Sequence, residues 1–105
     1  MPYIKEERRT SLYHCIDDMI NCIKHNIDAE GKELTNDQLL EICGDINYSF
    51  SRIAAGLMGK VSYPKIAIIT GVLENIKQEF YRRVASQYED SKIVSNGDIK
   101  EYKYI

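Results

Sequence analysis

Residues 62–88 read SYPKIAIITGVLENIKQEFYRRVASQY, and this stretch decides the fold class. Pro64 suits the first turn of a helix, because its missing N–H would have no partner there. Apolar residues then recur every three or four positions, the spacing that builds one stripe along an α-helix. We therefore predict a helix over residues 64–88, the longest and most regular of the chain. Its stripe consists of Ile66, Ile69, Leu73, Ile76, Phe80 and Val84.

Two further helices are predicted upstream of this one. Apolar residues at helical spacing from Leu12 to Ile27 indicate a helix over residues 5–27. Thr35 can cap the next helix while Gln38, three residues on, reaches back to its backbone amide, which is the capping-box pattern. That helix is predicted over residues 36–58, because Gly59 supplies a residue that can end it.

The chain changes character after these helices. Ile93-Val94 favours extended structure, and Asn96-Gly97 is typical of a tight turn. We expect an all-α protein in which residues 1–91 form a three-helix antiparallel bundle. Residues 92–105 would form a tail, either a short hairpin, a strand or a frayed end.

Composition and charge limit the possible functions. The chain has 105 residues, and its 14 Lys and Arg against 16 Asp and Glu give a formal net charge of −2, which argues against general DNA binding. No apolar run approaches the ~20 residues that span a bilayer, and the first residues lack the apolar centre of a signal peptide. We expect a protein of the cytoplasm, without membrane contact.

The predicted helix 64–88 also has a second side. Ala67 and Gly71 would let another backbone approach closely, and Ile68 lies near them. Either the three helices pack tightly there or this side meets a second subunit. A chain of this length buries one core but no deep cleft, so a site between subunits of a homo-oligomer is the expectation.

No catalytic, metal or cofactor site is predicted from local spacing. His14 and Asp18 are one helical turn apart, but there is no Glu-x-x-His motif that would complete a metal site. His14 and His25 are separated by about 16 Å of helical rise, too far to share one metal ion. Cys15 follows His14 directly, and adjacent helical residues point about 100° apart. The chain is therefore predicted not to be an enzyme. The three cysteines, at positions 15, 22 and 43, are expected to be reduced.

One segment is richer in binding chemistry than a solvated helix face requires. Arginines grip phosphate and tyrosines stack on bases, so this segment would suit a nucleotide-like anion. The predicted ligand-binding residues are Tyr81, Arg82, Arg83, Tyr88 and Lys92. The competing interpretation is internal pairing, because Glu79 precedes Arg82 and Arg83 by three and four residues.

Several short stretches also resemble a known family. They are Met1-Pro2-Tyr3-Ile4, Asp45-Ile46-Asn47-Tyr48 before Arg52, and the pattern GVLE (71–74), EFYRR (79–83), YED (88–90) and NGD (96–98). Together they resemble a family of small uncharacterised, domain-of-unknown-function proteins of bacteria and their phages. The resemblance spans nearly the whole chain, although Asp45-Ile46 stands where the family has a Gly-Glu-Leu pattern.

The resemblance implies a phage or prophage origin, and with it the host cytoplasm as location. Small helical phage proteins are often inhibitors, adaptors or sponges for nucleotide signals of host defence. We therefore expect a non-enzymatic, oligomeric helical binding protein, a phage accessory or anti-defence protein that sequesters a nucleotide-like ligand. The alternative is a structural or regulatory adaptor that binds a host or phage protein.

Overall fold

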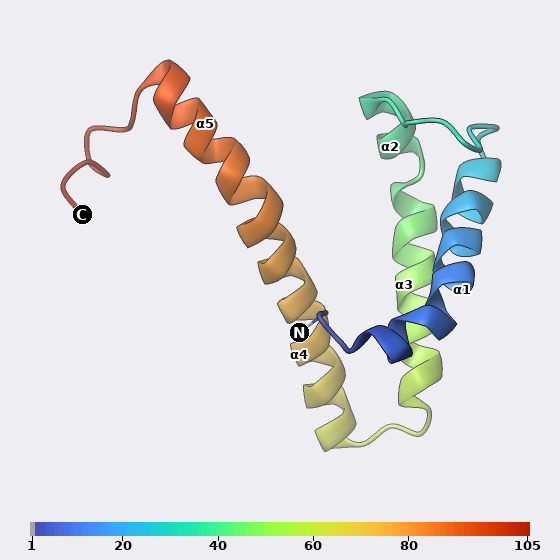
Figure 1. The fold of residues 1–105 in the computed structure, drawn as a ribbon. Helices are drawn as coiled ribbons and strands as arrows, with labels where there is room; N and C mark the ends of the chain where they lie inside the picture. Colours follow the sequence, from blue (N-terminus) through green and yellow to red (C-terminus); the bar gives the residue numbers. More distant parts are fainter. Residues whose placement is uncertain (1) are drawn as a thin grey trace. The chain divides into compact units, whose positions relative to one another are not determined.

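The computed structural model describes residues 2–105, and every regular element in that range is a helix (Figure 1). The all-α prediction is therefore confirmed. The chain divides into two compact units, residues 3–66 and residues 67–105 together with Pro2. In chain order the elements are α1 (Glu6–His25), α2 (Asn36–Glu41), α3 (Cys43–Met58), α4 (Tyr63–Phe80), the π-helix η1 (Tyr81–Ala85) and α5 (Ser86–Asn96).

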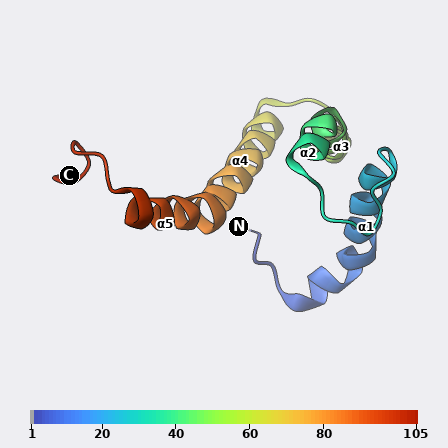
Figure 2. The same cartoon turned by 90° about the horizontal axis from the view of Figure 1, so that it is seen from above.

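In the unit of residues 3–66, α1 and α3 lie side by side (Figures 1 and 2). Residues 24–45, from the last turn of α1 to the first turn of α3, form a corner that is held by side-chain contacts. Lys24 Nζ donates to the carbonyl of Lys32 at 2.7 Å, and the Asn26 amide donates to Asp45 at 2.7 Å. The corner also holds Ala29 and Ile42, at 0% and 3% exposure the two buried residues among residues 2–105. The small core of this unit therefore lies in the corner.

The start of α2 shows the predicted capping box. Thr35 Oγ1 accepts from the backbone N–H of Gln38 at 3.2 Å, and the backbone N–H of Thr35 donates to Gln38 Oε1 at 3.0 Å. The helix expected over 36–58 is nevertheless interrupted at Ile42, whose φ of −96° and ψ of 9° lie outside the helical region. The interruption coincides with burial of the Ile42 side chain, so the corner gains an apolar centre where an unbroken helix was expected. Gly59 ends α3 with a φ of 65°.

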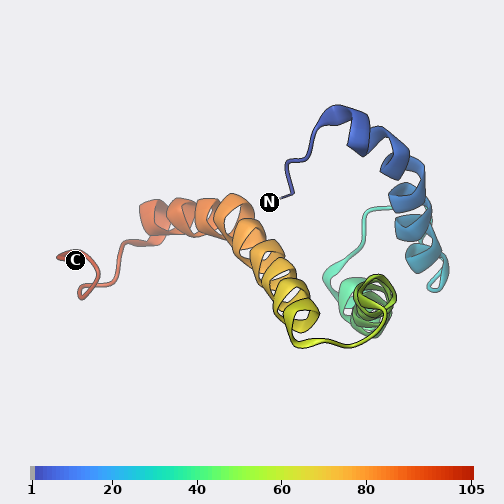
Figure 3. The same ribbon diagram turned by 90° about the horizontal axis from the view of Figure 1, so that it is seen from below.

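Residues 63–96 form one continuous helix. Phe80, Ala85 and Ser86, which flank the joints between α4, η1 and α5, all have right-handed helical torsion angles. Figures 2 and 3 show the same unbroken ribbon from above and from below. The helix therefore runs eight residues past the predicted end at Tyr88.

Of the three alternatives for residues 92–105, the hairpin and the strand are wrong, because residues 2–105 contain no strand and residues 92–96 belong to α5. The reason lies in Asn96-Gly97, which ends a helix instead of reversing a strand. Gly97 has a φ of 87°, and its N–H donates to the carbonyl of Ile93 at 2.9 Å. The residues after Gly97 form turns. In one of them the Tyr102 N–H donates to the Ile99 carbonyl at 3.0 Å.

The apolar stripes of the helices stay accessible in both units. In the unit of residues 3–66, Ile16 is 52% exposed on α1 and Phe50 is 58% exposed on α3. In the other unit, Leu73 and Phe80 of the α4 stripe are 46% and 65% exposed. Amphipathic helices need a partner for their apolar face, and neither unit alone supplies one for every helix.

Candidate functional site

The segment predicted to bind an anion spans η1 and α5. A π turn holds one residue more than an α turn, and such turns are frequent at functional sites. In an unbroken α-helix, residues eight apart point about 80° away from each other. The extra residue in η1 brings Tyr81 into line with Glu89, so that the Tyr81 hydroxyl donates to the Glu89 carboxylate at 2.9 Å. This hydrogen bond and the negative charge of Glu89 raise the pKa of Tyr81 above its usual 10.0.

Arg82 is paired with a carboxylate. Its Nη2 lies 2.5 Å from Glu79 Oε1 and its Nε lies 3.4 Å from Glu79 Oε2, the two-pronged geometry that arginine favours. The two residues also line a hollow of about 280 Å³ with Pro2, Asn75 and Gln78. The competing interpretation paired Glu79 with Arg82 or Arg83, and the structure contains the pair with Arg82.

Arg83, Tyr88 and Lys92 complete the predicted set. Tyr88 and Lys92 are brought together, with the ammonium 5.4 Å from the centre of the ring, which is a cation–π contact. The Arg83 guanidinium makes no hydrogen bond or ion pair with any residue in the range 2–105. Since Tyr81 and Arg82 are each bound to a carboxylate, Arg83 and Lys92 are the cations of the set most available to an anion.

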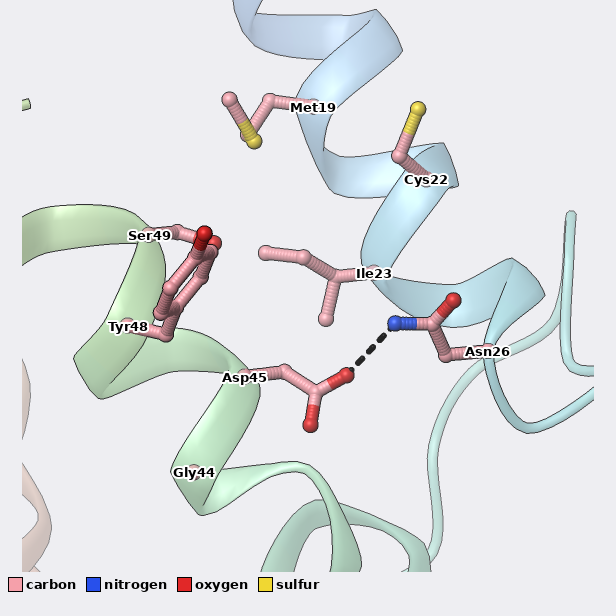
Figure 4. Close-up of a pocket in the computed structure, with 8 residues that line it drawn as sticks. All are labelled: Met19, Cys22, Ile23, Asn26, Gly44, Asp45, Tyr48 and Ser49. Atoms are coloured by element: carbon pink, nitrogen blue, oxygen red, sulfur yellow. Dashed lines mark hydrogen bonds between the residues drawn. The ribbon is translucent and has the colours of Figure 1, made fainter. Parts of the chain in front are cut away.

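A groove between α1 and α3 was not foreseen from the sequence (Figure 4). It has a volume of about 330 Å³. Figure 4 shows Ile23 pointing from α1 towards α3, and Asn26 meeting Asp45 at one end. The lining residues are Met19, Cys22, Ile23, Asn26, Gly44, Asp45, Tyr48 and Ser49.

A second hollow continues this groove along α3. It shares Met19, Tyr48 and Ser49 with the first and adds Arg52 and Ile53. The Arg52 guanidinium lies 5.9 Å from the centre of the Tyr48 ring. The groove therefore offers apolar and aromatic surface whose charged neighbours already have partners within the chain, a chemistry suited to an apolar side chain or a helix.

Sequence reasoning missed the groove because its two walls come from residues 19–26 and 44–53, and no periodicity within one helix reveals which faces will meet. A signal was nevertheless present. Asp45, Tyr48 and Arg52 are residues of the second stretch that carried the family resemblance, and all three line this groove.

The histidines and cysteines form no shared centre. Within residues 2–105, no three His, Cys, Asp or Glu side chains come close enough together to hold a metal ion. His25 Nδ1 contacts the Glu30 carboxylate, and this hydrogen bond raises the pKa of His25 above 6.5. Backbone hydrogen bonding, and then the bond from His25, lowers the pKa of Glu30 below 4.5. All three cysteines are free and exposed.

No helix within residues 2–105 combines the length and apolar character needed to cross a membrane.

Comparison with known proteins gives a family without an assigned activity. No curated protein and no solved structure matches the chain. Residues 1–99 match a family described as a domain of unknown function, DUF6899. That match covers all of α1 to α5, including the groove and the segment of residues 81–92. The chain is therefore a member of the DUF6899 family.

Proposed function

We propose that this protein is a non-enzymatic helical binding protein that acts as a homo-oligomer. The observation that carries the proposal is the exposure of apolar stripes in both units, with Ala29 and Ile42 the two buried residues among residues 2–105. Apolar surface on this scale is typical of chains that complete their core through association. A three-helix antiparallel arrangement within each subunit is part of the proposal.

Native mass spectrometry of gently purified protein tests the oligomer and any retained ligand together. An oligomer with a discrete added mass supports a binding protein that sequesters a small molecule. A bare oligomer supports association and shifts the ligand question to partner proteins. A bare monomer at micromolar concentration overturns the proposal.

The proposed ligand is a nucleotide-like anion held by the segment of residues 81–92. Arg83 supports this assignment, because it has no partner within residues 2–105 and arginine forms strong, two-pronged bonds to phosphate. Lys92 adds a second cation beside the Tyr88 ring, a surface on which a base could stack. Glu79 and Glu89 oppose binding, because their negative charges repel an anion. The anion must therefore bind while Glu79 stays paired with Arg82 and Glu89 stays paired with Tyr81.

Double substitution of Arg82 and Arg83 by Ala tests this site. We expect calorimetric titration with nucleoside triphosphates and cyclic dinucleotides to show binding to the wild type and none to the double variant. Lys77→Ala is the matched control, because it removes a cation from α4 outside the segment. Equal affinity of the wild type and the double variant removes the assignment of these arginines.

The groove between α1 and α3 favours a second candidate, an adaptor that binds a protein. Its apolar lining fits one face of an amphipathic helix, a common mode of peptide recognition. Ile23→Glu places a charge in this groove and distinguishes the two functions. An adaptor loses its protein partner through this substitution, whereas nucleotide binding at residues 81–92 persists.

The biological setting is proposed from the sequence resemblance. A phage or prophage accessory protein, acting in the host cytoplasm against a defence signal, would need a small binding chain and no catalytic centre. Nucleotide extraction from the purified protein, with and without infection of the host, tests this setting. A ligand that appears only in infected cells supports an anti-defence role, and the same ligand in uninfected cells argues against it.

A further inference from the structure

The hollow beside Arg82 has all its walls in one compact unit. Its lining residues are Pro2, Asn75, Gln78, Glu79 and Arg82, and each belongs to the unit formed by residues 67–105 together with Pro2. The shape of the hollow therefore follows from this unit alone. Its volume of about 280 Å³ lies just below the about 300–1,000 Å³ of sites for drug-sized molecules, so it accommodates one ring system and not a whole nucleotide.

Two carboxamides are the groups in this hollow that can bind a ligand. The Asn75 side chain makes no hydrogen bond with any residue in the range 2–105. The Gln78 amide nitrogen donates to Glu74 Oε1 at 3.3 Å, which leaves the Gln78 amide oxygen as an acceptor. Glu79 and Arg82 are paired with each other and take part in further interactions, so no ligand contact is assigned to them.

A carboxamide matches one edge of adenine. An Asn or Gln side chain presents a donor and an acceptor side by side. Adenine presents the complementary pair, an amino group next to a ring nitrogen that accepts, so one carboxamide makes two hydrogen bonds to it. Guanine presents two adjacent acceptors on the corresponding edge, and arginine is the side chain that fits them. The carboxamides of the hollow therefore favour adenine over guanine.

Arg83 lies on the same side of the long helix as Asn75. Residues eight apart in an unbroken α-helix point about 80° away from each other, and the extra residue of η1 reduces this angle to roughly 40° for this pair. The two residues are separated by about 11 Å of helical rise. A nucleotide laid along the helix reaches over such a distance, with its base at Asn75 and its phosphates at the Arg83 guanidinium.

We infer that the hollow receives the base of an adenine nucleotide, which Asn75 and Gln78 bind at its edge while Arg83 holds the phosphates. The Pro2 ring supplies an apolar wall for the flat face of the base. The inference rests on the proposed nucleotide-like ligand and names its base. It also extends the site beyond residues 81–92, to two residues of α4 that carry no charge.

Substitution of Asn75 separates base recognition from phosphate binding. Calorimetric titrations use ATP, GTP and inorganic tripolyphosphate. We expect the wild type to bind ATP at least about 10-fold more tightly than GTP, and Asn75→Ala to lose this preference while it keeps its affinity for tripolyphosphate. Arg83→Ala should weaken all three interactions. Alanine is the better helix former, so Asn75→Ala leaves α4 folded, which circular dichroism checks. Asn47→Ala is the matched control, because it removes an exposed carboxamide from α3 in the other unit.

The outcomes separate this inference from the proposed function. Equal affinity of the wild type for ATP and GTP, or a preference for ATP that persists in Asn75→Ala, overturns the inference and leaves the proposed anion site standing. A wild type that binds tripolyphosphate as tightly as ATP also overturns it, because the base then contributes nothing. A wild type that binds none of the three probes overturns the assignment of an anionic ligand and this inference with it.

Discussion

The corner of residues 24–45 and the helix of residues 63–96 differ in how they obtain order. The corner buries Ala29 and Ile42, and its contacts join residues far apart in sequence, such as Asn26 and Asp45. The long helix contains none of the buried residues, and the contacts described above for Tyr81, Arg82 and Tyr88 join residues three to eight apart. The corner is therefore stabilised by contacts between residues distant in sequence, whereas the contacts within the long helix are local and leave its apolar faces exposed.

The largest effect is expected from emptying the corner. Ile42→Ala removes its one large buried side chain and should lower the free energy of unfolding by about 2–5 kcal/mol. Leu40→Ala is the control, because Leu40 is two residues away and 70% exposed, and it should change stability by less than about 0.5 kcal/mol. Urea denaturation measures both. Equal effects of the two substitutions would show that the corner has no core.

A smaller effect is expected at the cap of α2. Thr35→Ala removes the side-chain acceptor of the Gln38 N–H and should cost about 1 kcal/mol. Thr35→Ser keeps the hydroxyl and should restore most of that stability. Thermal unfolding of the three proteins gives the comparison, and a cost as large for Ser as for Ala would contradict the capping role.

The contact of His25 with Glu30 should make the corner sensitive to pH. The raised pKa of His25 means that its contribution is fully present below about 6.5 and is lost as the pH rises through the folded-state value. The lowered pKa of Glu30 means that its contribution is present above about 4.5 and is lost as the pH falls through the folded-state value. NMR titration should show the pKa of His25 returning towards 6.5 in Glu30→Gln. An unchanged titration would mean that the two side chains do not pair.

The smallest effect is expected in the long helix, at the bond from Tyr81 to Glu89. Glu89→Ala removes the hydrogen bond and the negative charge that raise the pKa of Tyr81, so that pKa should fall back towards 10.0. NMR of the tyrosine ring carbons measures it, with Glu101→Ala as the control for a distant charge. Because the bond is exposed, global stability should hardly change. A Tyr81 pKa insensitive to this substitution would contradict the alignment across η1.

The sequence predicted the elements that depend on neighbouring residues. The capping box at Thr35 and Gln38, the end of α3 at Gly59 and the stripe of α4 all follow from spacings of a few residues. The break at Ile42 could not be predicted in the same way, because it accompanies burial in a corner formed by distant residues. Asn96-Gly97 fits both a hairpin turn and a helix end, and only the continuation of α5 decides between them.

The contacts of the candidate site likewise include some that local spacing predicts and some that it does not. The sequence offered the pairing of Arg82 with Glu79 as the alternative to anion binding, because the two residues lie within one helical turn. The pairing of Tyr81 with Glu89 was not predicted, since it requires the π turn and eight residues of an ideal α-helix would separate the two side chains. The groove between α1 and α3 was not predicted because its two walls come from helices that are far apart in the sequence.

The π turn also allows the long helix to lose one residue without changing the directions in which its side chains point. Because η1 holds one residue more than an α turn, deleting one of its residues, for instance Arg83, would close it into an ordinary turn and leave α5 in the same orientation relative to α4. The same deletion at Asn75 would rotate one part of the helix against the other by about 100°. The stretch YRRVA is thus the one place along this helix where the chain carries a spare residue, and loss of one arginine codon there would alter the charge of the helix without altering its faces.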